Sequence, residues 1–538
     1  MFLMGIERKG IMGSTQETKA EVKNGIKRMV FAVLSILLEV VIILFLIFYA
    51  GQKAGWIYVF FRFVAVILVL AIFGSSKTSS IRMTWMFVIL LLPVFGTALY
   101  FLIGLNGHTL KMRKRYTDID KVLFPMLPDD RETFGRVEKK DGHLAGIVNY
   151  IRRNASYPVY ENTDVQYFDD AAKGIEAQKQ DMAKAEKYIF MEYHAIEDAE
   201  SWHSIRDVLV ERVKAGVEVR VFYDDMGSIG FINKDFVKRT EEYGIQCRVF
   251  NPFGPGLNVF LNNRDHRKIT VIDGKVGYTG GYNLANEYFH ITEPFGYWKD
   301  TGIRLEGDAV QSLTLMFLQK WNIDETAPDF SVAQEKVPDA AASESAVESG
   351  LADPVPSGYV IPYCDCPLDE DKVGEAVYMD ILNRAGEYVH VMTPYLILDG
   401  ELETALKFAA ERGIDVSLIL PGIPDKKMAY ALAKSHYKSL LRSGVKIYEY
   451  TPGFVHAKVC VCDDEKAVVG TINFDYRSLY HHFECATYLY KTDCITEIEA
   501  DFQDTMSRCR QVTPETLHEE RLYYKVMGKL MKFVAPLM

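Results

Sequence analysis

Apolar residues are arranged in two ways along this chain, and each arrangement predicts a different kind of element. Near the N-terminus they form three nearly uninterrupted stretches, at residues 29–50, 56–73 and 85–105. A membrane-crossing helix needs about 20 apolar residues, so the first and third stretches are long enough. The second contains Arg62 and is marginal. The pattern predicts a transmembrane region over residues 29–107 with two or three spans, after a cytoplasmic tail over residues 1–28. A cleaved signal peptide is the alternative for the first stretch, but further apolar stretches follow it.

Charges on both sides of this region bear on its orientation. Basic residues cluster before the first stretch and again after the last one, at Lys23, Lys27, Arg28, Lys111, Arg113, Lys114 and Arg115. Basic flanks prefer the cytoplasm, which requires an even number of crossings although three candidates are present. We expect the rest of the chain to be cytoplasmic, because the second flank carries the denser charge.

Two charged residues inside the stretches form a candidate ion pair. If the first two stretches make a hairpin, Glu39 and Arg62 fall at a similar depth. Charges in a membrane are costly and usually paired, which predicts an ion pair between them. The alternative is that Arg62 extends its side chain to the membrane interface.

Beyond residue 140, short apolar runs alternate with amphipathic stretches, which predicts an α/β fold. The pattern recurs about two hundred positions later in the chain. Gly216 and Gly413, for example, each end a helical stretch and precede an alternating strand. A repeat of this length is a domain. The sequence therefore predicts two homologous lobes, over residues 140–328 and 357–538.

The segments beside the lobes differ in composition from them. Residues 108–139 form a basic connector, and residues 329–356 form a linker rich in small, acidic and proline residues. The linker has no apolar period and is expected to be flexible. The C-terminal run 523–538 alternates lysines with apolar residues, which predicts an amphipathic helix. Such a helix could lie on a membrane or pack its apolar face on the second lobe.

One short polar pattern, His-x-Lys-x4-Asp, occurs twice. Each copy is followed by a turn of small residues and an asparagine. The two copies comprise His266, Lys268, Asp273 and Asn283, and then His456, Lys458, Asp463 and Asn473. A duplicated half-site suggests a reaction that needs two of the same group.

The spacing within each copy indicates the chemistry. On a strand, positions two apart share a face, so His266 and Lys268 point the same way, as do His456 and Lys458. Two such pairs facing each other would bind a phosphodiester. One imidazole would attack phosphorus and the other would protonate the leaving oxygen. The lysines and the two asparagines would hold the non-bridging oxygens.

The aspartates have a different expected role. Asp273 and Asp463 lie seven positions after each histidine, on the opposite face of the strand and at turn sequences. We interpret them as structural residues at hairpin ends. The group that orients each imidazole must then come from elsewhere, and Asp300 and Glu484 are candidates because each lies on the segment after its motif.

The paired motifs resemble those of the phospholipase D superfamily, and the surrounding sequence resembles the bacterial cardiolipin synthases of that superfamily. The resemblance covers nearly the whole chain and is carried by segments 263–268, 392–416, 453–478 and 483–484. There are small departures: Asp265 stands where asparagine is commoner, and position 300 is Asp whereas position 484 is Glu.

The resemblance implies two pseudo-symmetric phospholipase D-like α/β/α lobes preceded by transmembrane helices, in a multi-pass protein of the cell membrane. It implies a catalytic set of His266, Lys268, Asp273, His456, Lys458 and Asp463, supported by Asn283, Asn473, Asp300 and Glu484. No metal or other cofactor is expected. Two phosphatidylglycerols would give cardiolipin and glycerol through a phosphohistidine, with His266 as nucleophile and His456 as general acid/base. The reverse assignment stays open.

Other functions fit the same residues. A phospholipase D-type hydrolase differs only in that water attacks the phosphohistidine, and a nuclease or an inactive membrane scaffold are further alternatives. The net charge of -11 argues against a general nucleic-acid binder. It does not exclude lipid binding, because local basic patches decide that. The expected partners are phosphatidylglycerol and other membrane lipids.

The remaining polar residues give weaker signals. The eight cysteines show no regular framework and are expected to be buried reduced thiols. His481 and His482 suggest a loop or strand role rather than a metal site. His194 and Glu192 are minor candidates for lining the cleft. Tyr193 and Tyr395 are either aromatic walls for a lipid headgroup or core residues.

Overall fold

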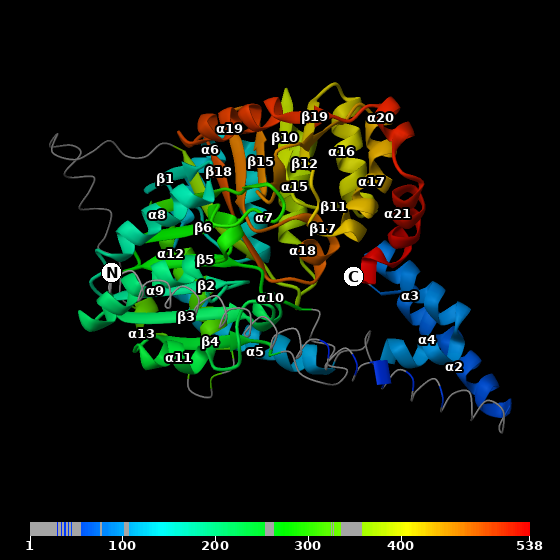
Figure 1. The fold of residues 1–538 in the computed structure, drawn as a ribbon, viewed down its shortest axis with the longest axis horizontal. Helices are drawn as coiled ribbons and strands as arrows, with labels where there is room; N and C mark the ends of the chain where they lie inside the picture. The colour runs from blue at the N-terminus through cyan, green and yellow to red at the C-terminus, as the bar shows by residue number, and fades with distance from the viewer. Residues whose placement is uncertain are drawn as a thin grey trace, which may run out of the picture.

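The computed structural model describes residues 55–537, except 76–77, 102–106, 253–262, 324, 326–327 and 335–357, and isolated positions between 30 and 45. Two large sheets with helices packed around them make up the body of the molecule (Figure 1). Most of the predicted linker falls outside the described residues. So does Glu39, and with it the predicted ion pair with Arg62.

The two sheets have matching topologies. The first has the order β1-β8-β6-β5-β2-β3-β4 and the second β19-β13-β12-β10-β15-β16-β18-β9. The first is built from β1 (Thr163–Phe168), β2 (Tyr188–Tyr193), β3 (Glu218–Asp224), β4 (Gln246–Phe250), β5 (Lys268–Ile272), β6 (Val276–Gly280) and β8 (Gly302–Gly307). The second is built from β9 (Tyr359–Asp365), β10 (Tyr388–Met392), β12 (Asp415–Pro421), β13 (Lys446–Tyr450), β15 (Val459–Cys462), β16 (Lys466–Gly470), β18 (Glu484–Tyr490) and β19 (Cys509–Gln511). Reversing one order aligns them strand for strand, with β19 as an addition, so the prediction of two homologous α/β lobes is confirmed.

Helices cover both sheets. Those of the first lobe are α7 (Gly142–Asn154), α8 (Ala171–Met182), α9 (Glu200–Lys214), α10 (Asp225–Ser228), α11 (Phe236–Glu242) and α12 (Val310–Trp321). Those of the second are α15 (Val373–Arg384), α16 (Gly400–Glu411), α17 (Lys427–Arg442), α18 (Tyr476–Tyr480), α19 (Ile495–Ser507) and α20 (Pro514–Glu519). Helix α12 is buried along nearly its whole length and contacts both β5 and β9. It therefore joins the cores of the two lobes.

Two backbone pairings connect the lobes next to the motifs. Strand β14 (Gly453–Val455) of the second lobe pairs in parallel with β7 (Tyr297–Lys299) of the first. Next to the first motif, the His266 N–H of the first lobe donates to the Phe483 carbonyl of the second lobe at 2.9 Å. The chain around each motif histidine is thus paired with a segment of the other lobe.

The two motif aspartates lie where β5 turns into β6 and where β15 turns into β16. The Asp273 carboxylate accepts hydrogen bonds from the N–H groups of residues 186, 187 and 188, at 2.8–2.9 Å. Asp463 accepts the corresponding bonds from residues 386, 387 and 388, at 2.7–2.9 Å. Each carboxylate fastens a hairpin to the start of the adjacent strand. The interpretation of both as structural residues at hairpin ends is confirmed.

The apolar N-terminal stretches are helical where the structure describes them. Helices α2 (Gly55–Phe73), α3 (Ser79–Leu91) and α4 (Pro93–Leu99) pack around a small core that includes Trp85 and Ile89. The expectation that stretch 85–105 is long enough to form a span is not supported, because α3 ends at Leu91 and α4 begins at Pro93, whose ring removes a backbone donor. Over the described part of the chain, no helix combines the length and the hydropathy that a membrane crossing requires.

The predicted basic connector is folded. It forms α5 (Gly107–Leu123), a short 3-10 turn (Phe124–Met126) and α6 (Arg131–Lys140). One side of α5 enters the core through Met112, Tyr116, Ile119 and Leu123. The Tyr116 ring stacks on Phe483 with centroids 5.1 Å apart. These four apolar residues are spaced by four, three and four positions, which is typical of one face of a helix. The expectation of a connector rested on the charge of the segment and did not use this spacing.

The C-terminal run forms α21 (Leu522–Val534), which packs on α17 and reaches α3. Gly528 allows this approach, since a Cβ there would clash with the Ala431 carbonyl. The other face carries apolar side chains that are largely exposed, including Leu522 (74%), Val526 (50%) and Leu530 (62%). Packing on the second lobe is therefore observed, and a second apolar face is left uncovered.

The Asp273 anchor predicts a loss of stability on substitution. In Asp273→Ala, three backbone N–H groups lose a charged acceptor, so we expect the free energy of unfolding to fall by about 1–3 kcal/mol. Denaturant unfolding followed by tryptophan fluorescence measures this. The exposed turn neighbour is the matched control, and Lys275→Ala should stay within about 0.5 kcal/mol of the parent. Equal stability of the two variants would remove the anchoring role.

Candidate active site

Each motif histidine faces a carboxylate from the other lobe. His266 Nδ1 lies 2.9 Å from Glu484 Oε2, and His456 Nδ1 lies 2.6 Å from Asp300 Oδ2. The two carboxylates named from the sequence do lie beside the imidazoles, but each serves the histidine of the opposite motif. A carboxylate at Nδ1 favours the tautomer that carries its proton there, which leaves the Nε2 lone pair free.

The turn after each motif fits its carboxylate. A Cβ on Gly281 would collide with Asp300 Oδ1, so glycine is required there. At the corresponding position of the second lobe, the Thr471 hydroxyl donates to Glu484 Oε2. The Asp and Glu found at positions 300 and 484 are thus each matched to the residue at the preceding turn. Sequence reasoning did not identify this role of Thr471.

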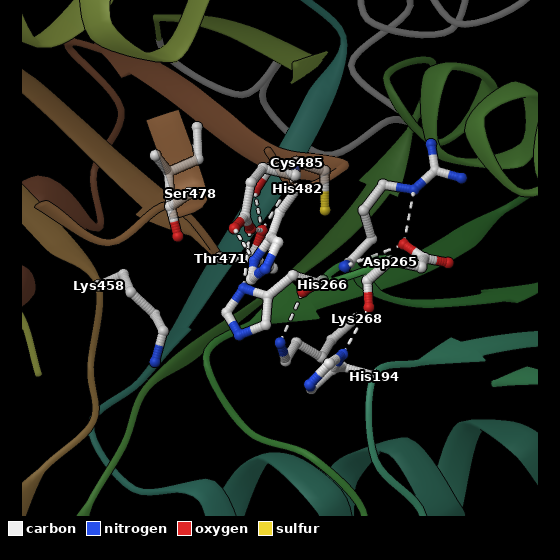
Figure 2. A network of polar contacts seen from close by, with 12 residues as sticks. His194, Asp265, His266, Lys268, Lys458, Thr471, Ser478, His482 and Cys485 are labelled. Atoms are coloured by element: carbon white, nitrogen blue, oxygen red, sulfur yellow. Dashed lines mark hydrogen bonds and ion pairs between the residues drawn. The ribbon is translucent and has the colours of Figure 1, made fainter. Parts of the chain in front are cut away.

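The two lysines share the site. Lys268 Nζ donates to the His266 carbonyl at 2.6 Å, and Lys458 Nζ lies 2.8 Å from His456 Nδ1. Figure 2 shows the amino groups of Lys268 and Lys458 on either side of the His266 ring. Burial lowers the pKa of Lys268 to about 8 and that of Lys458 to about 7, although nearby carboxylates act to raise both pKa values. A bound phosphate anion would favour their charged forms.

Burial lowers the pKa of both motif imidazoles. Burial, with Lys268 adding to it, lowers the pKa of His266 well below its ordinary value. Burial and Lys458 lower the pKa of His456 to about 4, against the opposing effect of Asp300. Burial alone would raise the pKa of Asp300, but His456 and Lys458 keep that pKa below its ordinary value. Lys458 and His456 also act on the pKa of His266, so the two half-sites lie within electrostatic reach of each other.

The two asparagines that follow the motifs along the chain differ in their hydrogen bonds. Asn283 is held at both ends of its amide, because Oδ1 accepts from the Ala195 N–H at 3.1 Å and Nδ2 donates to the Tyr288 hydroxyl at 2.8 Å. Asn473 is buried, and its Oδ1 has no hydrogen-bond partner among the described residues. Their expected contact with a phosphate therefore stays a prediction.

The surroundings of the two imidazoles differ. His456 lies among aromatic rings, with Tyr288 at 5.2 Å and Trp298 at 5.4 Å between ring centroids. His266 lies among other imidazoles, with His194 at 5.0 Å and His482 at 5.4 Å. Sequence reasoning favoured a loop or strand role for His482. One sequence signal pointed to its place in the site. His482 precedes Glu484 by two residues, just as Trp298 precedes Asp300.

The minor candidates divide between site and core. His194 stands beside His266, whereas Glu192 is fully buried and accepts a hydrogen bond from Arg267 Nε at 2.7 Å. Tyr193 is a core residue whose hydroxyl lies 3.1 Å from that of Thr270. Tyr395 packs beside Phe454, which is also close to His456.

Buried ion pairs hold the first motif in place. Arg264 donates to Asp224 at 2.7 Å, and the Asp265 N–H donates to the same carboxylate at 3.0 Å. The unusual Asp265 carboxylate accepts from the Arg267 N–H at 3.2 Å. The second motif has buried Val455 and Ala457 at the positions of Asp265 and Arg267. The two half-sites share the motif histidine, lysine, aspartate and asparagine and differ in the residues that support them.

Among the cysteines, Cys485 lies next to Glu484 and within the network of Figure 2. The cysteines are free thiols, and those fully buried are Cys247, Cys460, Cys462, Cys485 and Cys494. The prediction of buried reduced thiols holds for these five.

Comparisons with known proteins agree with this arrangement. Residues 179–308 and 378–506 match the family described as cardiolipin synthase, phospholipase D-like domain, and residues 63–104 match the phospholipase D-nuclease N-terminal family. Cardiolipin synthase 2 of Bacillus anthracis is 31% identical over 87% of this chain and 88% of its own length. An uncharacterized protein of Streptococcus mutans is 46% identical over 87% of this chain and 99% of its own.

A solved structure shares the fold. The phosphatidylserine synthase of Haemophilus influenzae superposes with a TM-score of 0.53 at 15% identity, covering 73% of this chain and 98% of that one. The two matched domains, the paired motifs and the relatives of similar length lead to one conclusion: the chain belongs to the family of bacterial cardiolipin synthases that carry two phospholipase D-like domains.

Proposed function

We propose that this chain transfers the phosphatidyl group of one phosphatidylglycerol to a hydroxyl of a second, which forms cardiolipin and releases glycerol. The observation that carries the proposal is the pair of imidazoles, each held at Nδ1 by a buried carboxylate of the opposite lobe. Two such groups suit a double displacement at one phosphorus, in which a nucleophile and a proton carrier are both needed.

The first half-reaction opens the donor lipid. His266 Nε2 attacks phosphorus, the bond to the glycerol oxygen breaks, and that oxygen takes a proton from His456. A general acid must hold a proton in the substrate complex. His456 is the better candidate, because Asp300 acts to raise its pKa, whereas the surrounding imidazoles and lysines lower the pKa of His266. The negative charge of a bound phosphodiester would raise both pKa values further.

The second half-reaction uses the same groups in reverse. A hydroxyl of the second phosphatidylglycerol gives its proton to His456 and attacks phosphorus, and His266 leaves with its lone pair restored. Lys268 and Lys458 stabilise the charge on the non-bridging oxygens during both steps. If water took the place of the alcohol, the product would be phosphatidic acid, which is the alternative hydrolase.

Product analysis separates transfer from hydrolysis. Purified full-length protein with phosphatidylglycerol should give cardiolipin and free glycerol in equal amounts. Phosphatidic acid as the main product would support the hydrolase instead. His266→Ala and His456→Ala should each lower the rate by about a thousandfold or more. The surface variant His203→Ala is the matched control and should retain the rate.

The roles of the two histidines can be distinguished with a donor whose leaving group needs no proton. With phosphatidyl-p-nitrophenol, His456→Ala should release one p-nitrophenol per chain in a burst and accumulate a phosphohistidine. His266→Ala should show neither. The opposite pattern would reverse the assignment.

We also propose that the chain is anchored in the cell membrane through its N-terminal apolar stretches, with both lobes on the cytoplasmic side. The proposal is supported by apolar side chains that are exposed on α2, α3 and α21, which lie at one end of the molecule (Figure 1). Examples are Phe63, Phe87 and Leu530. A surface of this kind is usual where a protein meets lipid or another protein.

Fluorescence quenching tests the position of α21. In Leu530→Trp, the added indole should be quenched by brominated lipid in reconstituted vesicles, because the side chain would lie in the acyl region. Tyr243→Trp, which replaces an exposed aromatic residue directly after α11, is the control, and its quenching should not exceed that of the parent. Helix α11 lies at the opposite end of the molecule from α21 (Figure 1). Equal quenching of the two variants would contradict immersion of α21.

A further inference from the structure

His482 has polar atoms that the proposed reaction leaves unused. The side chain is buried, and neither ring nitrogen has a hydrogen-bond partner among the described residues. Its nearest acid is Glu484, whose Oε1 lies 3.6 Å from His482 Nδ1. That Oε1 is likewise buried and without a partner in the described chain. Buried polar atoms are nearly always satisfied, so this pair of unused groups points to a missing ligand.

His266 completes the group. One ligand atom from each of His266, His482 and Glu484 can be chosen so that all lie within 4.8 Å of one another. Around a tetrahedral Zn²⁺ with bonds of about 2.0–2.1 Å, ligand atoms are about 3.3 Å apart. The three side chains therefore need only small rotations to meet one ion. Two imidazoles and a carboxylate are ligands that zinc commonly takes, with water in the fourth position.

The charges around the group permit a cation. Lys268, Lys458 and Arg477 oppose a cation there, whereas the negative charges of Glu484 and Asp300 favour one, and the lowered pKa values of the two lysines weaken their opposition. Figure 2 shows His482 and His266 close together, with His194 on the far side of His266. His194 Nδ1 is held by the Asp265 carbonyl at 2.6 Å, so this third imidazole helps to enclose the group without being counted among its ligands.

We propose that His266, His482 and Glu484 form a binding site for Zn²⁺ and that zinc bound there inhibits the enzyme. Binding at His266 Nδ1 would move the proton that this nitrogen shares with Glu484 Oε2 to Nε2, so the ring stays neutral and Nε2 loses its free lone pair. No electron transfer is involved. Because the ion would take both His266 and its orienting carboxylate, the histidine could no longer act as a nucleophile. The inhibition rests on the proposed function, whereas the binding does not.

Calorimetric titration of the metal-free, full-length protein with ZnCl₂ tests the binding. We expect one ion per chain, with affinity at least tenfold weaker in His482→Gln and in Glu484→Gln. The adjacent residue provides the control, since His481→Gln should bind as the parent does. X-ray absorption of the zinc complex should show nitrogen and oxygen ligands with the scattering pattern of imidazole. A thermal melt of each variant separates loss of a ligand from loss of the fold.

Two results would overturn the site: the absence of saturable binding, or equal affinity in the parent and in His482→Gln. Inhibition is measured separately, as cardiolipin formation that falls with zinc occupancy and returns after EDTA. Binding without any cardiolipin-forming activity in the metal-free protein would leave the zinc site standing and reject the proposed function. Binding without inhibition in an active protein would reject the inhibitory role.

Discussion

A carboxylate from the opposite lobe orients each motif imidazole, and the rest of the site depends on these two crossed pairs. His266 meets Glu484 and His456 meets Asp300, both at hydrogen-bond distance and both buried. The pairing of β7 with β14 and the bond from His266 to the Phe483 carbonyl bring these groups together. A single lobe holds a histidine without its partner, so one functional site requires both lobes in contact.

The two half-sites carry the same motif residues, but the surroundings of those residues differ. The first motif is held by buried ion pairs such as Arg264–Asp224, and its histidine has imidazole neighbours. The second is held by apolar residues, and its histidine has aromatic neighbours. Around His266, neighbouring lysines and imidazoles lower the pKa of the ring. Around His456, the nearby Asp300 carboxylate acts to raise the pKa of the ring. This difference gives a physical basis for separate roles in one reaction.

Much of this arrangement could be predicted from the sequence, because it follows from local periodicity. The repeated strands, the two motifs and the turn positions of Asp273 and Asp463 are encoded within short segments. The crossed pairing could not be predicted, since the distance along the chain from His266 to Asp300 says nothing about which lobe Asp300 faces. Long-range packing also placed the apolar side of α5 in the core, although its charged residues suggested a connector. It likewise placed His482 beside His266. The stretch 85–105 was judged by its apolar length alone, and that criterion does not register the interruption at Pro93.

The most direct test of the crossed pairs is ¹⁵N NMR of the histidine side chains in two conservative variants of the full chain. The signals of His266 and His456 are assigned from their disappearance in the corresponding His→Gln variants. In Asp300→Asn, the tautomer and pKa of His456 should change while those of His266 stay close to the parent values. In Glu484→Gln, the order should be reversed. If Asp300→Asn instead perturbed His266 and left His456 unchanged, the crossed arrangement would be contradicted.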